Sequence, residues 1–401
     1  MRYAGITLLA AVTCCVIHSA TALGQDRIEL RSSDLGMRES VDGKIVDRVF
    51  GNVYWYNPER DLHIYCDTTE FFRNDQRYIL LGNVTIVDPE KILRSDKVLY
   101  FQDIEEAYIP GPFIYREILH ERSLTADRGT YFYGKEQLNA WGNVIYADSV
   151  RTLSADSAVY YEAEQIGSVF GNVRIKDNSR DAVADGEFGE YYQKENYTFL
   201  TGSPRIAIAD STSSDSLIIT GLKMEYFGGD TSRFVVTDSA VITKGSLSAM
   251  SRIAIYDRKD SVIYLRDNPR ILQDSTRING TEIDLIVAGE TVNEVIVREE
   301  AVAVMPADST GIYDCENVLS GKTLHFFLED GEIRKIIASK NAFSDYYQFS
   351  QDDLIGKHIL SGEQIILYFS NGVVDSLISD FDKSEFVPKR LLPDIKKKLY
   401  E

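Results

Sequence analysis

A short phrase, Gly-Asn-Val, recurs in this sequence at intervals of about thirty residues or twice that number. It begins at Gly51, Gly82, Gly142 and Gly171, with Gly111-Pro112-Phe113 near the middle of the one long gap. In several copies the residues two and four places after the glycine are apolar, which is the period of a strand with one buried face. A thirty-residue unit cannot bury such a face alone, so successive units must stack. Weaker copies follow at Gly202-Ser203-Pro204, Asp238-Ser239-Ala240, Asp267-Asn268-Pro269, Glu300-Ala301-Val302 and Lys340-Asn341-Ala342.

A second row of markers lies between the copies of the first, and three and five places after each marker the residues are again mostly apolar. The row is centred on Asp67, Asp96, Asp127, Asp156 and Asp185, and continues at Gly221, Met250, Gly280, Gly321 and Gly362. Each unit therefore supplies two short strands, and about ten units predict an elongated all-β stack of two-strand repeats. The apolar residues that the two rows place on the buried face are Val84, Ile86, Leu99, Phe101, Phe132, Val144, Val159, Tyr161, Val173, Ile175, Phe188, Met224, Ile253, Ile255, Ile283, Leu285, Leu324 and Phe326.

Residues 1–22 have the pattern of a secretory signal peptide. A basic start at Arg2 leads into an apolar run from Ala4 to Ile17, and Ala20-Thr21-Ala22 offers an A-x-A cleavage site. The run is shorter than the roughly 20 residues that a membrane-spanning helix needs. We therefore expect export with cleavage of the signal, rather than a membrane anchor.

Charge and cysteine content narrow the class of protein further. The chain carries 43 Lys+Arg against 62 Asp+Glu, a net charge of −19, which excludes a basic nucleic-acid-binding protein. The cysteines outside the signal, Cys66 and Cys315, lie about eight repeats apart. A disulfide needs Cα atoms within about 7 Å, so we predict that these two cysteines are unpaired.

No pattern typical of catalysis or cofactor binding occurs in the sequence. There is no G-x-S-x-G elbow, P-loop or zinc-ligand spacing, so neither an enzyme nor a cofactor nor a metal is expected. The aspartate row could be a calcium ladder, but the glycine-rich nonapeptide of such ladders is missing. We favour a structural role for these aspartates, at strand starts, and a turn role for the Gly-Asn pairs.

The apolar rows themselves leave two alternatives open. Their side chains could fill a closed core, or the stacked sheets could stay open along one side and hold a long apolar ligand. Periodicity does not separate these alternatives.

The phrases resemble a known repeat. Gly142-Asn143-Val144, then Ser154-Ala155-Asp156-Ser157-Ala158, then Gly171-Asn172-Val173 are similar to the repeat of the organic-solvent-tolerance (OstA) family, which includes the lipopolysaccharide-transport protein LptA and the N-terminal domain of LptD. The resemblance divides the mature chain into a clear repeat region, residues 40–208, and a more divergent one, residues 209–380. It implies a β-jelly-roll, or β-taco, with an apolar groove for lipid A acyl chains, in which the residues of the two apolar rows face the groove.

The resemblance also implies partners and a location. It predicts a periplasmic, non-enzymatic transport protein, associated with outer-membrane assembly, that binds lipopolysaccharide or a similar lipid. Other Lpt-type jelly-rolls would join it by edge-strand pairing. The alternative is a structural β-solenoid that scaffolds the envelope and carries no lipid. The basic tail, residues 381–401, is expected to form a short helix that caps the last repeat, or to contact an anionic partner surface.

Overall fold

The computed structural model describes residues 29–392, except 59–60, 88, 90, 102, 119–120, 150, 162, 178–181, 210–215, 230–231, 289–290, 308–312, 330, 351–352 and 371–372. The predicted signal peptide lies outside the described residues, as do residues 393–401 of the tail. The described chain consists of antiparallel strands with three short 3₁₀ turns and contains no α-helix. The all-β prediction is confirmed.

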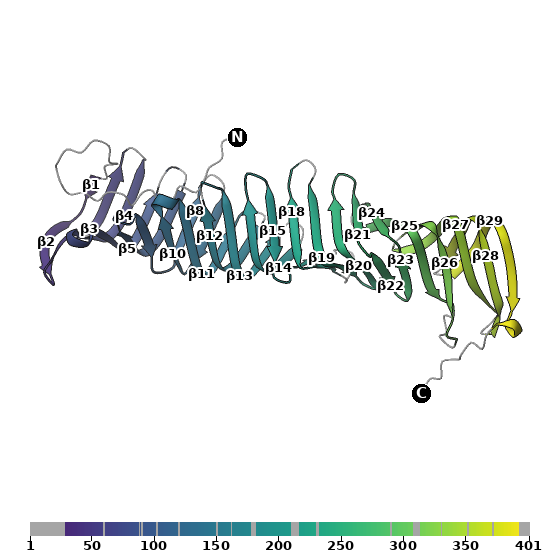
Figure 1. The fold of residues 1–401 in the computed structure, drawn as a ribbon. Helices are drawn as coiled ribbons and strands as arrows, with labels where there is room; N and C mark the ends of the chain where they lie inside the picture. Colours follow the sequence, from purple (N-terminus) through teal and green to yellow (C-terminus); the bar gives the residue numbers. More distant parts are fainter. Residues whose placement is uncertain are drawn as a thin grey trace, which may run out of the picture. The chain divides into compact units, whose positions relative to one another are not determined.

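The chain divides into two compact units, Met1–Gly202 and Ser203–Glu401. Within each unit the strands follow one another along the sheet largely in sequence order (Figure 1). The first unit contains β1 (Glu29–Ser32), β2 (Leu35–Val41), β3 (Lys44–Asn57), β4 (Leu62–Phe72), η1 (Arg73–Asp75), β5 (Arg77–Val87), β6 (Lys91–Phe101), β7 (Glu106–Ile109), β8 (Phe113–Glu117), β9 (Arg122–Ala126), β10 (Arg128–Phe132), η2 (Tyr133–Lys135), β11 (Gln137–Ala147), β12 (Arg151–Tyr161), β13 (Ile166–Asp177), β14 (Ala182–Tyr192) and β15 (Tyr197–Thr201).

The second unit has the same construction. It contains β16 (Arg205–Ile208), β17 (Leu217–Thr220), β18 (Lys223–Phe227), β19 (Arg233–Lys244), β20 (Leu247–Asp257), β21 (Val262–Arg266), β22 (Arg270–Gln273), β23 (Thr276–Asn279), β24 (Glu282–Ala288), β25 (Thr291–Pro306), β26 (Glu316–Glu329), β27 (Glu332–Ser350), β28 (Asp353–Ser370), β29 (Val373–Pro388) and η3 (Lys389–Leu391).

The Gly-Asn pairs are bends in the middle of strands rather than turns between strands. In β5, Gly82 and Asn83 both have positive φ, +72° and +49°, and the pairing register with β6 shifts between Leu81 and Val84. A bulge of this kind bends the strand, so each long strand has a half on either side of a corner. A Cβ on Gly82 would collide with the Asp67 side chain, which explains the glycine.

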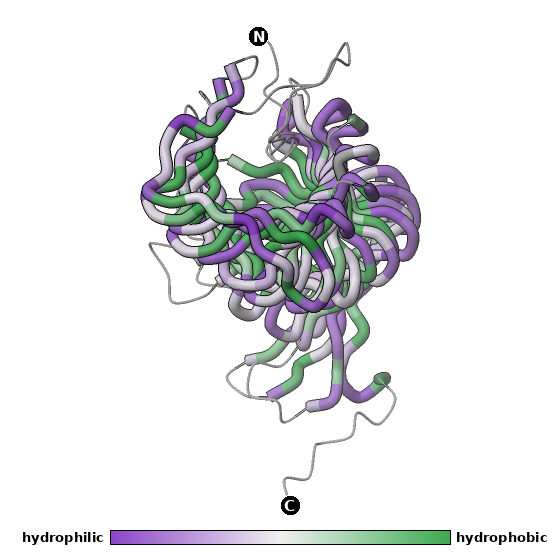
Figure 2. Tube along the Cα trace, turned by 90° about the vertical axis from the view of Figure 1, so that its left-hand side faces the viewer, coloured by the Kyte–Doolittle hydropathy of each residue, from purple (hydrophilic) through white to green (hydrophobic). Residues whose placement is uncertain are grey.

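The two halves fold toward each other, and the residues between them form the core. Trp55, which follows the corner of β3, donates a hydrogen bond from Nε1 to Oγ1 of Thr69, on the far side of the corner of β4, at 3.1 Å. We call the side that faces between the halves the inner face and the opposite side the outer face. Figure 2 shows hydrophobic and hydrophilic residues interspersed along the strands, as expected when side chains alternate between two faces.

The second unit keeps the corners although glycine is lost from them. The same pair of positive-φ residues recurs at Asp238/Ser239, Asp267/Asn268, Glu299/Glu300 and Lys340/Asn341. Three of these positions are the ones that the weaker copies of the phrase predict. The copy at Glu300 is placed one residue too late, because the corner pair there begins at Glu299.

The cysteine prediction is confirmed and the tail prediction needs correction. Cys66 and Cys315 are both buried and free, and burial raises the pKa of the Cys66 thiol. The expected C-terminal helix is not what the described part of the tail forms. Strand β29 continues to Pro388, and only the single 3₁₀ turn η3 follows it.

Candidate functional site

The inner face contains ten of the eighteen residues that the sequence predicts for it. In the first unit Val84, Ile86 and Val144 are buried in one cluster, and Val173 is buried in a second cluster against which half-buried Ile175 packs. In the second unit five of the seven predicted residues belong to one buried cluster: Met224, Ile283, Leu285, Leu324 and Phe326. Whether these residues touch a ligand is a separate matter from their position.

The other eight predicted residues lie on the outer face. In β6 the buried inner residues are Val98 and Tyr100, so Leu99 and Phe101 point outward. The second row of markers is offset by one residue at several copies, and a slip of one residue moves a side chain to the opposite face. The corrected residues are Leu99, Phe101, Phe132, Val159, Tyr161, Phe188, Ile253 and Ile255.

The interior between β3 and β11 is closed by large side chains. Trp55, Tyr78, Tyr100 and Tyr131 point inward from four strands, and each is at most 3% exposed. They belong to one continuous cluster that extends from Val49 to Val144. A core this well filled leaves no room for an acyl chain without movement of side chains.

The inner face of β12–β14, residues 151–192, is built differently, and we call it the open segment. Small residues occupy several of its inner positions, including Ala155, Ala158, Gly167 and Ala184, whereas the Leu200 side chain fills the space beside Gly186 and Gly189. Apolar inner side chains such as Val169 and Ile175 are consequently only half-buried, and Tyr191 is 42% exposed. The inner face of the open segment therefore carries an exposed apolar surface. Sequence analysis missed Val169, Ala184 and Tyr191, although alternating Ala and Gly at inner positions was a usable signal.

Polar groups border the open segment. Tyr146 lies across the interior, on the half after the corner of β11. Burial raises the pKa of the Tyr146 hydroxyl, and the charges of Arg122, Asp148 and Glu117 act on it as well, so the hydroxyl stays neutral. The Glu117 carboxylate is buried within 3.7 Å of the Arg122 guanidinium. The Arg122 cation, the Glu117 anion and the neutral Tyr146 hydroxyl therefore lie close to the apolar surface of the open segment.

A buried ion-pair cluster closes the other end of the interior, at β2 and β3. Asp47 has a side chain that is 7% exposed. It accepts hydrogen bonds from Nε of Arg38 at 2.5 Å and from Nε of Arg73 at 2.6 Å. Burial by itself raises the pKa of the Asp47 carboxyl, but the hydrogen bonds and charges of the two arginines outweigh burial, so its pKa lies below the ordinary value of about 3.9.

The lowered pKa of Asp47 predicts a pH dependence of stability. A carboxyl whose pKa is lower in the folded state contributes stability above its unfolded pKa, and the contribution is lost as pH falls through the folded pKa. Asp47→Asn should therefore lower the melting temperature above about pH 5, and the gap to the wild type should shrink below about pH 4. Thermal melts from pH 2 to 7 measure this, with exposed Asp103→Asn as the control. A gap that is constant down to pH 2 would contradict the assignment.

The predicted aspartate row is a structural ladder along the corners. Nδ2 of Asn83, Asn143 and Asn172 donates to the carboxylates of Asp67, Asp127 and Asp156 respectively, each at 2.9 Å. A structural role is thus supported, but two details of the prediction are wrong. Asp67 and Asp156 lie in the middle of β4 and β12 rather than at strand starts, and the partner is an asparagine amide of a neighbouring strand rather than a local backbone N–H. Among the described residues, no three His, Cys, Asp or Glu side chains are grouped as metal ligands would be.

The terminal strands have unpaired edges. β29 pairs with β28, and no described strand pairs with its other side. Its exposed apolar residues include Ile378, 57% exposed, and Phe386. At the start of the first unit β2 likewise pairs only with β3 among the described strands, and it exposes Leu35 and Met37. Within the described chain, no helix has the length and hydrophobicity to cross a membrane.

Comparison with known proteins identifies what this architecture is similar to. A sequence model of a family described as LptA/(LptD N-terminal domain) LPS transport protein matches residues 63–289, which is more than half of the 401-residue chain. The match begins in β4 and ends after β24, so it includes the closed interior apart from β3, the open segment and the corner ladder from Asp67 to Asn172. A search of curated protein sequences finds no match.

Proposed function

Because this chain belongs to the family of lipopolysaccharide transport proteins that includes LptA and the N-terminal domain of LptD, we propose that it binds the acyl chains of lipopolysaccharide on its inner face. The protein acts in the periplasm after export, and passes the lipid toward the outer membrane. It does so without enzymatic chemistry and without a cofactor.

The observation that carries the proposal is the exposed apolar inner surface of the open segment. Val169, Ile175 and Tyr191 offer apolar area that the small residues around them leave uncovered. Each CH₂ group of an acyl chain that leaves water for such a surface is stabilised by about 0.8 kcal/mol. Several shielded CH₂ groups therefore bind the lipid firmly while leaving it free to slide along the surface.

The negative charge of the protein opposes binding of the phosphorylated headgroup of the lipid. A net charge of −19 repels a phosphorylated lipid. The Arg122 guanidinium beside Tyr146 gives the border of the open segment a donor for a phosphate group, although Glu117 offsets its charge. Divalent cations bridging phosphate and carboxylate groups would supply the remaining compensation.

The partners are other jelly-roll proteins of the same transport type, joined by strand addition. The unpaired edges of β2 and β29 support this, because a free edge presents a row of N–H and C=O groups to a second chain.

Photo-crosslinking of two neighbouring tyrosines tests the proposal. Tyr191 faces inward, whereas Tyr192 points outward and donates its hydroxyl to Glu190. With benzoyl-phenylalanine in place of Tyr191, irradiated cells should yield lipopolysaccharide adducts, and the same analogue at Tyr192 should yield several-fold fewer. Immunoblots of the purified protein with a lipopolysaccharide antibody measure the adducts.

A second candidate function is a structural envelope scaffold without lipid. The closed interior between β3 and β11 favours it, because a filled core is what a scaffold needs. Equal or absent lipopolysaccharide adducts at Tyr191 and Tyr192 would support the scaffold and refute lipid transport.

A further inference from the structure

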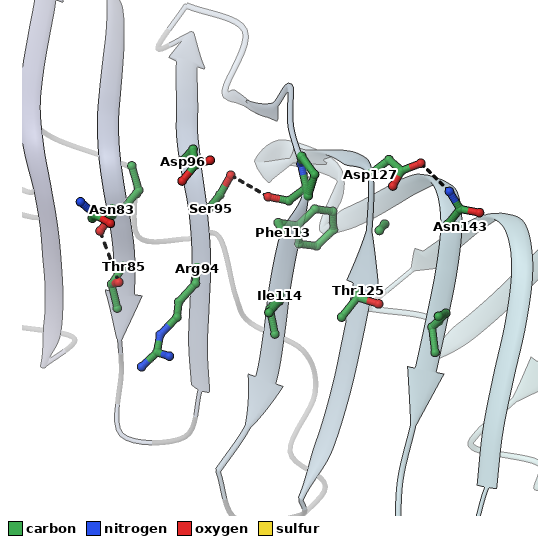
Figure 3. Close-up of a pocket in the computed structure, with 14 residues that line it drawn as sticks. Asn83, Thr85, Arg94, Ser95, Asp96, Phe113, Ile114, Thr125, Asp127 and Asn143 are labelled. Carbon is green, nitrogen blue, oxygen red and sulfur yellow. Dashed lines mark hydrogen bonds between the residues drawn. The ribbon is translucent and has the colours of Figure 1, made fainter.

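The outer face of the first unit has a hollow of about 640 Å³, which we call the outer hollow (Figure 3). Its floor is a row of outward side chains that are direct cross-strand neighbours: Thr85, Arg94, Ile114, Thr125 and Ile145. Its rim follows the corner and includes Asn83, Asp96, Pro112, Asp127 and Asn143. The volume falls within the range of about 300–1,000 Å³ that is typical of small-molecule sites.

An interruption of the corner ladder creates the hollow. Where the neighbouring corners at Gly82 and Gly142 have Gly-Asn, this corner has Gly111-Pro112. Gly111 is not among the positive-φ residues, and a Cβ built on it would meet nothing within 4 Å. The corner is therefore recessed here, and Asp96 has lost the asparagine that its counterparts Asp67 and Asp127 retain.

Two opposite charges in the outer hollow have no partner among the described residues. Asp96 and Arg94 point to the same face of β6, and neither makes a hydrogen bond or ion pair with the described chain. Figure 3 shows the Arg94 side chain directed away from Asp96. Both groups are thus free to bind an incoming ligand.

An aromatic ring stands at one end of the same row. Tyr65 lies between Tyr54 and Thr85 in the cross-strand register. Its ring stacks on Tyr54, with centroids 4.8 Å apart and planes 8° apart. One face of the Tyr65 ring is therefore covered, and the other is directed toward the short Thr85. The His63 ring lies parallel to the Tyr65 ring at 6.4 Å between centroids, and Tyr65 is 42% exposed, so part of its side chain is accessible.

From these features we propose that the outer hollow binds a short oligosaccharide, uncharged or carrying amino groups. A sugar ring stacks its C–H face on an aromatic ring such as Tyr65 and packs on exposed Ile114 and Ile145, which are 48% and 42% exposed. Its hydroxyls can accept hydrogen bonds from the planar guanidinium of Arg94 and donate hydrogen bonds to the carboxylate of Asp96. An amino group on the sugar would pair with Asp96 as Asn143 does with Asp127.

Other ligand classes fit the outer hollow less well. The backbone groups of the floor strands are already paired within the sheet, so an added peptide strand would find no free backbone N–H and C=O groups to pair with. The rim carboxylates disfavour a nucleic acid and a strongly anionic ligand. The site lies on the outer face, so the inference is independent of lipid binding to the inner face.

Saturation-transfer NMR with the full chain tests the proposal. The probes are chitotetraose, its de-N-acetylated form, cellotetraose, maltotetraose and the lipid-free core oligosaccharide released from lipopolysaccharide. At least one probe should receive saturation, and titration should show its affinity weakened about tenfold by Tyr65→Ala and by Asp96→Ala, the loss of one stacking or charged hydrogen-bond contact. Binding confined to the core oligosaccharide, which is anionic through its acidic sugars, would contradict the proposed class of ligand, and binding of the other probes would support it.

The controls are matched residues outside the outer hollow. Tyr161 is an exposed outward tyrosine, and Asp156 is a corner aspartate that keeps its asparagine. Tyr161→Ala and Asp156→Ala should leave the affinity unchanged within about twofold. No saturation of any probe would overturn the proposal. So would binding that Tyr65→Ala and Asp96→Ala weaken no more than the controls do.

Discussion

Phe326→Ala should destabilise the second unit by about 3–5 kcal/mol, the usual cost of removing a buried phenylalanine ring. Phe326 is 1% exposed and lies in an inner row between Val295 and Ile336. Both neighbours are themselves buried, so the cavity left by the ring would have little freedom to collapse. Urea denaturation followed by circular dichroism measures the loss as a shift of the midpoint.

The next residue along the chain is the matched control for Phe326. Phe327 is half-buried on the outer face, against the His325 ring at 4.0 Å and the Lys335 ammonium at 5.5 Å. Phe327→Ala should cost only about 1 kcal/mol. If the two variants were equally destabilised, the assignment of inner and outer faces in β26 would be wrong.

Ala184→Trp should lower the amount of lipopolysaccharide that copurifies with the protein on the order of tenfold or more. Ala184 is a small inner residue beside Ile175 in the open segment. An indole there would occupy the space that an acyl chain needs, and each displaced CH₂ group loses about 0.8 kcal/mol. Mass spectrometry of lipid A from the purified protein measures the bound amount.

Val183→Trp adds the same bulk on the opposite face of β14. Val183 pairs with Lys176 on the outer side, so its replacement should leave the bound lipid unchanged. Melting temperatures of both variants show whether each stays folded. If a folded Ala184→Trp protein retained the full amount of lipid, the lipid would not bind in the open segment.

The repeat made the corners of the fold predictable because their backbone conformation is demanding. Two consecutive residues with positive φ strongly favour Gly and Asn, so Gly82-Asn83 and Gly171-Asn172 are conspicuous in the sequence. The later corners use Asp238-Ser239 or Lys340-Asn341 instead. Only the regular interval made those corners detectable, and the copy near Glu300 is out by one residue.

The face assignments failed where both faces of a strand are apolar. In β6 the outward Leu99 and Phe101 are as hydrophobic as the inward Val98 and Tyr100, so hydropathy does not identify the buried face. The position of the corner identifies the buried face, because the inner side chains lie two and four places after the corner. Counting from the corner in every copy would have placed all eight misassigned residues correctly.

The thirty-residue period does not predict where the interior is filled by side chains and where it is left open. Tyr131 and Tyr191 are both inward tyrosines, yet one is buried and the other is 42% exposed. The difference depends on what the neighbouring strands contribute, which is bulky side chains around Tyr131 and residues such as Gly167 and Ala184 around Tyr191. The side-chain volumes around a given residue can be summed only when the register of the strands is known, because the register decides which side chains are neighbours.

The corner ladder has a consequence for how a protein of this kind can change its length. Within each unit a strand pairs only with near neighbours in the sequence, and the corners repeat the same geometry except at Gly111-Pro112. Duplicating or deleting one thirty-residue segment in phase would therefore preserve all remaining contacts and alter the unit by two strand spacings, about 9–10 Å. Duplication or deletion of such segments within a gene can thus change the length of the unit in fixed increments of two strand spacings.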